Sequence, residues 1–140
     1  MAGKLSGLGA TTTVDDSAGT PNDISNDVTN YEFATPRGVQ DTTGVNKSAM
    51  ERQLLLADFS VTLNGVFNVD SAKSHLTLSS VSSTSVARTV KIQPINASVP
   101  YLSCETLFTD YQISRADSGA LTFQAPGVLQ DGTTPTWVNS

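Results

Sequence analysis

The sequence holds few of the residues that catalytic and metal sites need. Cys104 is the only cysteine and His75 the only histidine among 140 residues. One cysteine excludes an intramolecular disulfide, and the pair supplies too few ligands for a Cys/His zinc site. Phosphate-binding glycine loops and the HExxH, CxxC and GxSxG motifs are also absent. We therefore expect no catalytic residue, no metal and no cofactor, in a protein that is not an enzyme.

The two reactive side chains themselves sit in unremarkable contexts. Cys104 shares its phase with Leu102 and Phe108 in an alternating segment, which indicates a small buried side chain. His75 stands in a polar KSHL segment, where a surface or capping role is expected. The oxygen-rich segment 22–27 lacks the glycine and the distal glutamate of a calcium loop, so Asx turns explain it better.

Charge is sparse and negative. Charged residues make up 15% of the chain, the net charge is −5, and the eight Lys and Arg residues are scattered singly. Tight DNA binding needs several basic side chains on one face, so this class of function is excluded. The sequence has no apolar run of eighteen residues and no hydrophobic segment near its N-terminus, so we expect no membrane insertion and no signal peptide.

Hydroxyl side chains are abundant instead. Seventeen Ser and eighteen Thr make up a quarter of the chain, whereas there are only one Trp, three Tyr and five Phe. Thr favours strands, and Ser, Gly and Asn favour turns. The composition predicts an all-β protein of one domain, 1–140, whose core relies on Leu, Val and Ile.

Period-two alternation locates the strands. The clearest strand lies within 54–68, where Phe59, Val61 and Leu63 alternate with polar residues after a run of three leucines. Asn-Gly at 64–65 shifts the phase, and we expect a bulge there rather than a hairpin. Further strands are expected at 86–93 and 101–113, and after a polar turn at 115–119 the alternation resumes over 121–125.

Three segments lack such alternation or carry it weakly. We expect an N-terminal arm over 1–21, a long loop over 36–53 and a C-terminal arm over 126–140. The C-terminal arm carries apolar side chains without a pattern of its own, so it needs a surface to lie on, and a second copy could supply that surface. A short helix is expected within 70–80, capped by Asp70 or Ser71, with Ala72, Leu76 and Ser79 on one face.

Four segments resemble tail tube proteins of long-tailed bacteriophages, especially phages of siphovirus type that infect actinobacteria. The segments are 22–29 (NDISNDVT), 57–68 (ADFSVTLNGVFN), 88–92 (RTVKI) and 107–113 (LFTDYQI) with the hairpin that follows. The resemblance implies an antiparallel β-sandwich or open barrel with one short helix and extended terminal arms, the tail-tube fold. It also implies hexameric rings that stack into a hollow tube, with 36–53 as a long loop or hairpin that reaches toward the next ring.

The resemblance gives roles to two sets of residues. The polar sides of the strands are candidates to face the lumen: Asp58, Ser60, Thr62, Asn64, Asp110 and Gln112. Candidate contacts between subunits are Trp137, Leu129, Val128, Val39, Val45, Met50 and Arg52. Trp137 is the best single anchor, because large aromatic side chains dominate interface energy, although it could equally pack in its own subunit.

Partners and location follow from the same resemblance. The expected partners are further copies of the chain and other tail proteins at the tube ends, while DNA passes through without specific binding. An acidic channel would repel the duplex and let it slide. The expected location is the virion tail, assembled in the host cytoplasm.

A second reading remains open. A β-sandwich with long loops could be a binding or decoration module of a virion, with aromatic side chains stacked on sugar rings. The candidate aromatics are Tyr31, Tyr101, Tyr111 and Trp137, and they do not cluster in the sequence. Failure to assemble, together with glycan binding, would favour this module.

Overall fold

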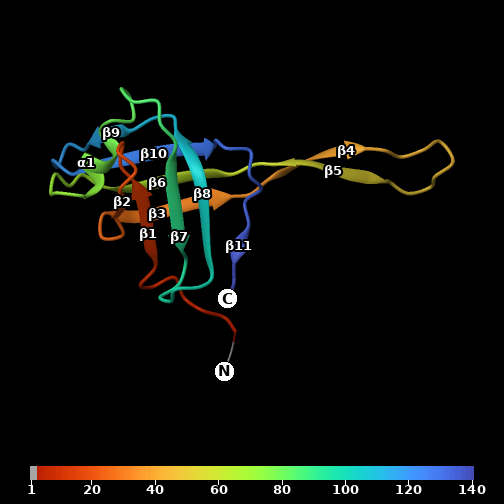
Figure 1. The fold of residues 1–140 in the computed structure, drawn as a ribbon, viewed down its shortest axis with the longest axis horizontal. Helices are drawn as coiled ribbons and strands as arrows, with labels where there is room; N and C mark the ends of the chain where they lie inside the picture. The colour runs from red at the N-terminus through yellow and green to blue at the C-terminus, as the bar shows by residue number, and fades with distance from the viewer. Residues whose placement is uncertain (1–2) are drawn as a thin grey trace.

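The computed structural model describes residues 3–140, which form an almost entirely antiparallel β structure (Figure 1). Nine strands make one sheet, and two more make a separate hairpin. The strands are β1 (Thr11–Asp15), β2 (Pro21–Asp23), β3 (Val28–Ala34), β4 (Arg37–Asp41), β5 (Arg52–Ala57), β6 (Ser60–Val66), β7 (Arg88–Gln93), β8 (Tyr101–Phe108), β9 (Gln112–Arg115), β10 (Leu121–Leu129) and β11 (Trp137–Val138). One short helix, α1, spans Ser74–Leu78. The predicted all-β class with a single short helix is confirmed.

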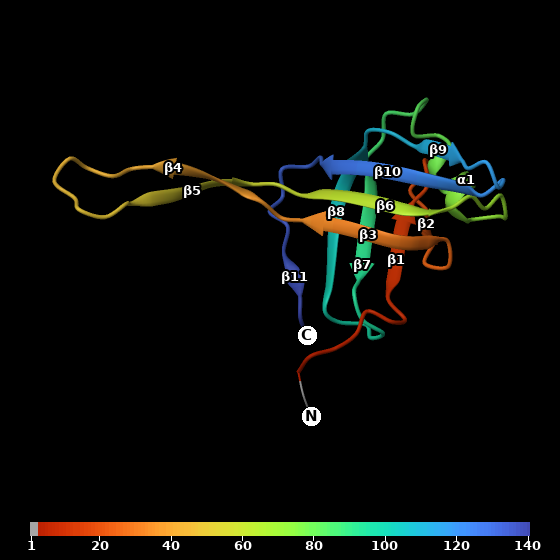
Figure 2. The ribbon, with the colours of Figure 1, turned by 180° about the vertical axis from the view of Figure 1, so that it is seen from behind.

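The large sheet folds over on itself into two layers. Its strand order is β2-β1-β7-β8-β10-β6-β3, with β11 added beside β8 and β9 beside β10. Figures 1 and 2 show β10, β6 and β3 running across the direction of β1, β7 and β8. The layers join where β8 pairs with β10. At this junction, a Cβ atom on Gly127 would lie only 2.6 Å from Cγ2 of Thr106. Glycine at this corner therefore allows the two strands to approach.

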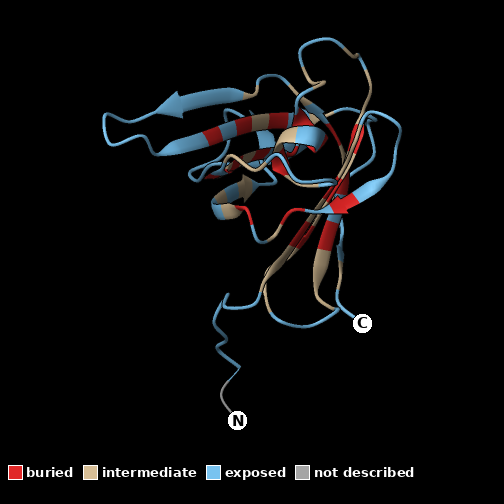
Figure 3. Ribbon diagram, turned by 90° about the vertical axis from the view of Figure 1, so that its left-hand side faces the viewer, coloured by how far each residue is buried: buried red, intermediate tan, exposed pale blue. Residues whose placement is uncertain are grey.

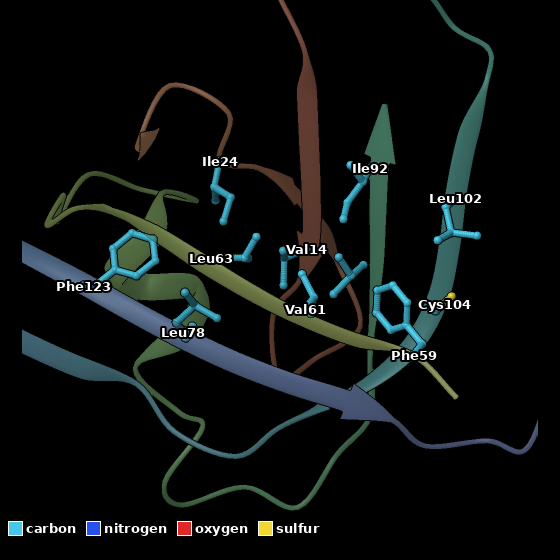
Figure 4. Close-up of a cluster of buried hydrophobic side chains, with 12 residues drawn as sticks. Val14, Ile24, Phe59, Val61, Leu63, Leu78, Ile92, Leu102, Cys104 and Phe123 are labelled. Atoms are coloured by element: carbon cyan, nitrogen blue, oxygen red, sulfur yellow. The ribbon is translucent and has the colours of Figure 1, made fainter. Parts of the chain in front are cut away.

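The core fills the space between the two layers. Figure 4 shows side chains of β6 and β10 facing side chains of β1, β7 and β8. Phe59, Val61 and Leu63 are almost completely buried, as the alternation predicted, and so is Leu102 on β8. Cys104 is a free, buried thiol in this core, and burial raises its pKa to about 11. The predicted structural role of the cysteine is confirmed.

The bulge near Asn64 and Gly65 lies on the opposite strand. β6 continues through Asn-Gly without a break, whereas the register of β3 shifts between Val28 and Asn30. A Cβ atom at Gly65 would lie 2.2 Å from the carbonyl oxygen of Asp27. Glycine at 65 thus leaves room for the bulging backbone of its neighbour.

The helix starts later than predicted and has a different cap. Lys73 occupies the N-cap position and makes no capping bond with its side chain. Instead the buried carboxylate of Asp27 accepts a hydrogen bond from the backbone N–H of Ser74 at 3.0 Å and one from Asn68 Nδ2 at 2.9 Å. The predicted caps, Asp70 and Ser71, and the predicted face of Ala72, Leu76 and Ser79 are therefore wrong. The helix buries Ser74, Thr77 and Leu78, because a distant carboxylate fixes where it begins.

The segment after the helix is held by a buried arginine. Arg88 at the start of β7 is 1% exposed and donates hydrogen bonds to the carbonyl oxygens of Asp15 and Thr77 and to Ser80 Oγ. Burial lowers the pKa of its guanidinium from the ordinary value. The group bonds to three acceptors, one at the end of β1 and two at the end of α1, which is why a charged side chain is tolerated in the core.

Both predicted terminal arms are shorter than expected. Residues 11–15 form β1, which pairs with β7 and β2 inside the sheet, so only the segment before Thr11 leaves it. Residues 126–129 belong to β10 and pair with β6 and β8. Hydroxyl-rich β1 and the Pro-Gly pair of β10 weakened the sequence signal in these strands. No helix in the described chain is long and apolar enough to span a membrane.

The predicted 36–53 loop is mostly a β-hairpin. β4 and β5 pair with each other and continue β3 and β6 beyond the body of the molecule (Figure 1). The register shifts between Arg37 and Val39, and the Arg37 guanidinium closes this bulge with two bonds to the carbonyl oxygen of Leu55, at 3.0 and 2.8 Å. The hairpin therefore projects from one end of the molecule as a two-stranded ribbon.

Candidate functional site

The outer surface of β3, β6, β10 and β9 is a broad polar face. Alternation directs Val61, Leu63, Phe123 and Ala125 into the core, so their neighbours point outward. The strand registers place the following residues on this outer polar face: Asn30, Glu32, Ala34, Ser60, Thr62, Asn64, Val66, Gln112, Ser114, Thr122, Gln124, Pro126 and Val128.

A row of four amide side chains crosses this face. Gln112 pairs with Gln124, Gln124 with Asn64, and Asn64 with Asn30 in successive ladders. Asn64 Nδ2 donates a hydrogen bond to Asn30 Oδ1 at 2.8 Å. A shallow depression beside Asn30, Asn64 and Gln124 opens to solvent. The row presents donors and acceptors to water without any net charge.

The charge of the outer polar face is low and negative. Glu32 is its single ionisable residue, and none of its thirteen members is Lys or Arg. A surface of this kind offers phosphates no cationic partner, so it cannot release counterions from a bound duplex.

Four of the six residues predicted to face the lumen lie together on this face. They are Ser60, Thr62, Asn64 and Gln112. The other two lie outside the strands. Asp58 accepts a hydrogen bond from the backbone N–H of Phe59 at 2.8 Å, and Asp110 does the same for Tyr111. Both aspartates thus serve short connections at the ends of strands.

The sequence prediction missed Asn30, Glu32, Thr122 and Gln124 on the same face. The signal was present, because Tyr31 and Phe33 alternate on β3 and Leu121, Phe123 and Ala125 alternate on β10. The polar partners of these residues necessarily point to the opposite side. What the sequence lacked was the strand order that brings the four segments side by side.

The second notable surface is the β4–β5 hairpin, which exposes apolar side chains. Leu56 is 90% exposed and Leu54 56%, and Val39, Val45, Met50 and Leu55 are also exposed. At the tip, Lys47 pairs with Glu51 at 3.2 Å, and Thr43 Oγ1 accepts a hydrogen bond from the backbone N–H of Glu51. The tip is therefore an ordered turn, although the ribbon below it has no core.

Six of the seven predicted contact residues fall in three places. Val39, Val45, Met50 and Arg52 lie on the hairpin, where Arg52 stands opposite Asp41. Val128 belongs to the outer polar face and is 40% exposed, whereas Leu129 packs against the core. These positions leave the hairpin residues free for a partner and commit Leu129 largely to its own chain.

Trp137 packs within its own chain. Strand β11 pairs with β8, and the indole lies 5.8 Å from the ring of Phe33, which in turn stacks on Tyr31 at 5.8 Å. Trp137 still exposes 38% of its surface. Tyr101 and Tyr111 lie elsewhere, beside Lys91 and His75 respectively. The four aromatics considered for a sugar site therefore do not form one platform.

The edge of β3 is open. Within residues 3–140, β3 pairs with β6 alone, so its other edge carries unpaired backbone groups. Its seven residues include one charged side chain, Glu32, and no proline or lysine. Apart from Glu32 and the bulge between Val28 and Asn30, this edge carries none of the usual protection against pairing with another chain.

The whole fold is similar to that of chains from gene transfer agent particles. The chain matches a chain from the tail of an empty gene transfer agent particle refined with helical C6 symmetry, with a TM-score of 0.70 and 12% identity, over 98% of this chain and 99% of that one. It also matches a chain from the virion of a native gene transfer agent particle, with a TM-score of 0.67 and 13% identity, over 95% and 99%. No protein-family model and no curated protein matches. At these identities the similarity establishes the fold.

Proposed function

We propose that this chain is a structural protein of a phage-like virion tail, and that its copies form hexameric rings that stack into a hollow tube. The observation that carries the proposal is the similarity over almost the full length of both chains to a tail component with C6 symmetry. A match of both chains from end to end includes the arms and hairpin that an assembly would use. The absence of a catalytic constellation in the sequence agrees with a structural role.

The outer polar face lines the channel in this proposal. Its amide row and hydroxyls keep a layer of water at the wall, and Glu32 makes the wall weakly acidic. DNA passes along such a wall without specific binding, because the face carries no Lys or Arg. Ser60, Thr62, Asn64 and Gln112 remain the predicted lumen residues, joined by Asn30, Glu32 and Gln124.

Contacts between copies use the open edge and the hairpin. The open edge of β3 can pair with a neighbour in the ring, and closure of the ring removes the edges that would otherwise aggregate. The hairpin of 36–53 contacts the next ring through Val39, Val45, Met50 and Arg52. An isolated two-stranded hairpin is marginally stable in water, so docking would also order it.

Other tail proteins bind at the tube ends, and assembly takes place in the host cytoplasm before the tube joins a virion of siphovirus type. These partners follow from the role of a tube subunit. The chain contributes no membrane insertion of its own in this account.

Negative-stain electron microscopy of the purified protein over a range of concentrations tests the proposal. We expect rings or tubes with a central hole above a threshold concentration. A protein that stays monomeric at every concentration and binds glycans would instead be a binding or decoration module. In that case Trp137 and Tyr31 would be the first positions to substitute.

A further inference from the structure

The two ends of the long axis both expose apolar side chains. The β4–β5 hairpin forms one end, and α1 with the β9–β10 turn forms the other (Figures 1 and 2). Figure 3 looks at the second end with the residues coloured by burial. A single chain cannot bring these two ends together, because the whole body lies between them.

The second end carries a connected patch, which we call the end patch: Phe67, His75, Tyr111, Ile113 and Leu121. The ring of His75 lies 4.6 Å from that of Phe67 and 5.9 Å from that of Tyr111. Ile113 pairs with Phe123 in the β9–β10 ladder, and the carbonyl oxygen of Leu121 accepts a hydrogen bond from the N–H of Phe67. Ile113 is 41% and Leu121 36% exposed, and the three rings are half-buried.

The hairpin exposes apolar side chains on both of its faces. Val39 and Leu54 are paired in the ladder and share one face, so Leu55 points to the other. At the root, an open hollow is lined by Pro36, Leu56 and Ala57 among others. Apolar side chains on both faces of a two-stranded ribbon have no core within their own chain to bury them.

The charges of the two ends are complementary. Residues 37–52 contain three basic and two acidic side chains, a net charge of +1 in a chain of net charge −5. The segments 67–79 and 109–121, which hold the end patch, contain two basic and three acidic side chains, a net charge of −1. The hairpin is thus a mildly basic projection from an acidic protein, and the opposite sign of the segments around the end patch favours docking on another copy of the chain.

We propose that the hairpin of one copy docks on the end patch of the next copy along the tube. This inference rests on the proposed function and names the surface that receives the hairpin. The interface is heterologous, because the hairpin of one copy contacts a different surface, the end patch, on the next copy. Repeating such a contact does not close on itself along the tube axis, so each added copy extends the stack. Leu54, Leu55 and Leu56 supply the apolar contact, and Ile113 and Leu121 receive it.

Site-specific photocrosslinking in assembled tubes tests this pairing. A benzophenone amino acid replaces Leu56 in protein that is an equal mixture of ordinary and ¹⁵N-labelled chains, so that mass spectrometry distinguishes links between copies from links within one. We expect mixed-isotope crosslinks to peptides from 67–79 and 109–121. The same probe at Ser17, in the exposed turn between β1 and β2, is the control: it lies near α1 of its own chain and can link to it there, but it should give no mixed-isotope crosslinks to these peptides.

A pair of adjacent substitutions gives an independent readout. Leu121→Asp places a charge in the end patch, and Thr122→Asp places the same charge on the outer polar face. We expect Leu121→Asp to raise the threshold concentration for tubes by about tenfold or more, which corresponds to the loss of a modest apolar contact. Thr122→Asp should change it by less than about twofold.

The outcomes separate this inference from the proposed function. If tubes form and the Leu56 probe links only to other segments, or if Leu121→Asp assembles like Thr122→Asp, the docking surface is wrong and the tube function stands. If the unmodified protein never forms rings or tubes, the proposed function fails and this inference fails with it.

Discussion

The nine-stranded body and the β4–β5 hairpin place the same kinds of side chain in opposite environments. In the body, Phe59, Val61 and Leu63 are buried, and the polar residues between them are outside. In the hairpin, which is continuous with the same strands, Leu54, Leu55 and Leu56 are all exposed. The body can thus fold on its own core, whereas the hairpin has apolar surface that only a partner can cover.

The body and the hairpin differ in the alternation of apolar and polar residues along their strands. The body strands alternate between apolar and polar residues, because one face packs and the other meets water. A run of three consecutive leucines places apolar groups on both faces of a strand. In a buried strand this is ordinary, but in a projecting ribbon it leaves apolar side chains exposed on both faces, as the proposed assembly requires. The comparison therefore predicts that substitutions in the body change stability and those in the hairpin change association.

The largest stability effect is expected in the body, for Leu63→Ala. Leu63 is 0% exposed, and its removal leaves a cavity between the layers. We expect the free energy of unfolding to fall by about 2–5 kcal/mol, measured by urea denaturation below the assembly threshold. A loss under about 1 kcal/mol would mean that the two layers are not closely packed.

Thiol reactivity reports whether the body is closed. Burial raises the pKa of Cys104 from 9.0 to about 11, so the folded protein holds the thiol protonated. Alkylation at pH 8 should be roughly 100-fold slower than in the urea-unfolded chain. Because the folded pKa is the higher one, this contribution to stability is complete below pH 9 and is lost as the pH rises through about 11. Equal rates in both states would contradict a closed body.

Two arginines make the same kind of bond in the two regions. Arg88 donates to the carbonyl oxygens of Asp15 and Thr77 inside the body, and Arg37 donates to that of Leu55 on the exposed hairpin. Arg88→Met should lower the free energy of unfolding by about 1–3 kcal/mol, because buried acceptors lose their donors. Arg37→Met should cost less than about 0.5 kcal/mol, since water replaces the donor. Thermal and urea unfolding of both variants would check the difference.

The smallest stability effect is expected for Leu54→Ala. The side chain is 56% exposed and lies outside the core, so the free energy of unfolding should change by less than about 0.5 kcal/mol. Assembly should nevertheless weaken, with a threshold concentration at least about fivefold higher. Sedimentation velocity measures the fractions of free and assembled protein, and urea denaturation measures the free energy of unfolding. A variant that unfolds more easily but assembles normally would reverse the comparison between body and hairpin.

Much of the body could be predicted from the sequence. Alternation in 59–63, 88–93 and 121–125 predicts both the strands and the residues that they bury, and the polar turn at 115–119 predicts the β9–β10 hairpin. The turn ends at Gly119, whose φ of 92° suits glycine. The candidate lumen residues of β6 and β9 lie on one face for the same reason. Period-two patterns fix faces, although they do not fix which strands are neighbours.

The remaining features depend on contacts between distant segments. Asp27 caps a helix that begins 47 positions later, and Arg88 bonds to Asp15 across 73 positions. No local pattern signals either contact, and the helix cap was therefore assigned to the wrong residues. For 36–53 the residues alone predicted a long loop, because neither face of the segment is consistently apolar or polar, and only the resemblance allowed for a hairpin. β1 was weak in the sequence because three of its five residues are threonine, which favours strands but shows no alternation between apolar and polar residues.

Helical reconstruction of assembled tubes by electron cryomicroscopy tests the central claim most directly. The account predicts sixfold rings in which the outer polar face, including Asn30, Asn64, Gln112 and Gln124, lines the channel and every hairpin is covered by a neighbouring copy. Tubes that turn this polar face outward, or particles in which the hairpins remain uncovered in solvent, would contradict it.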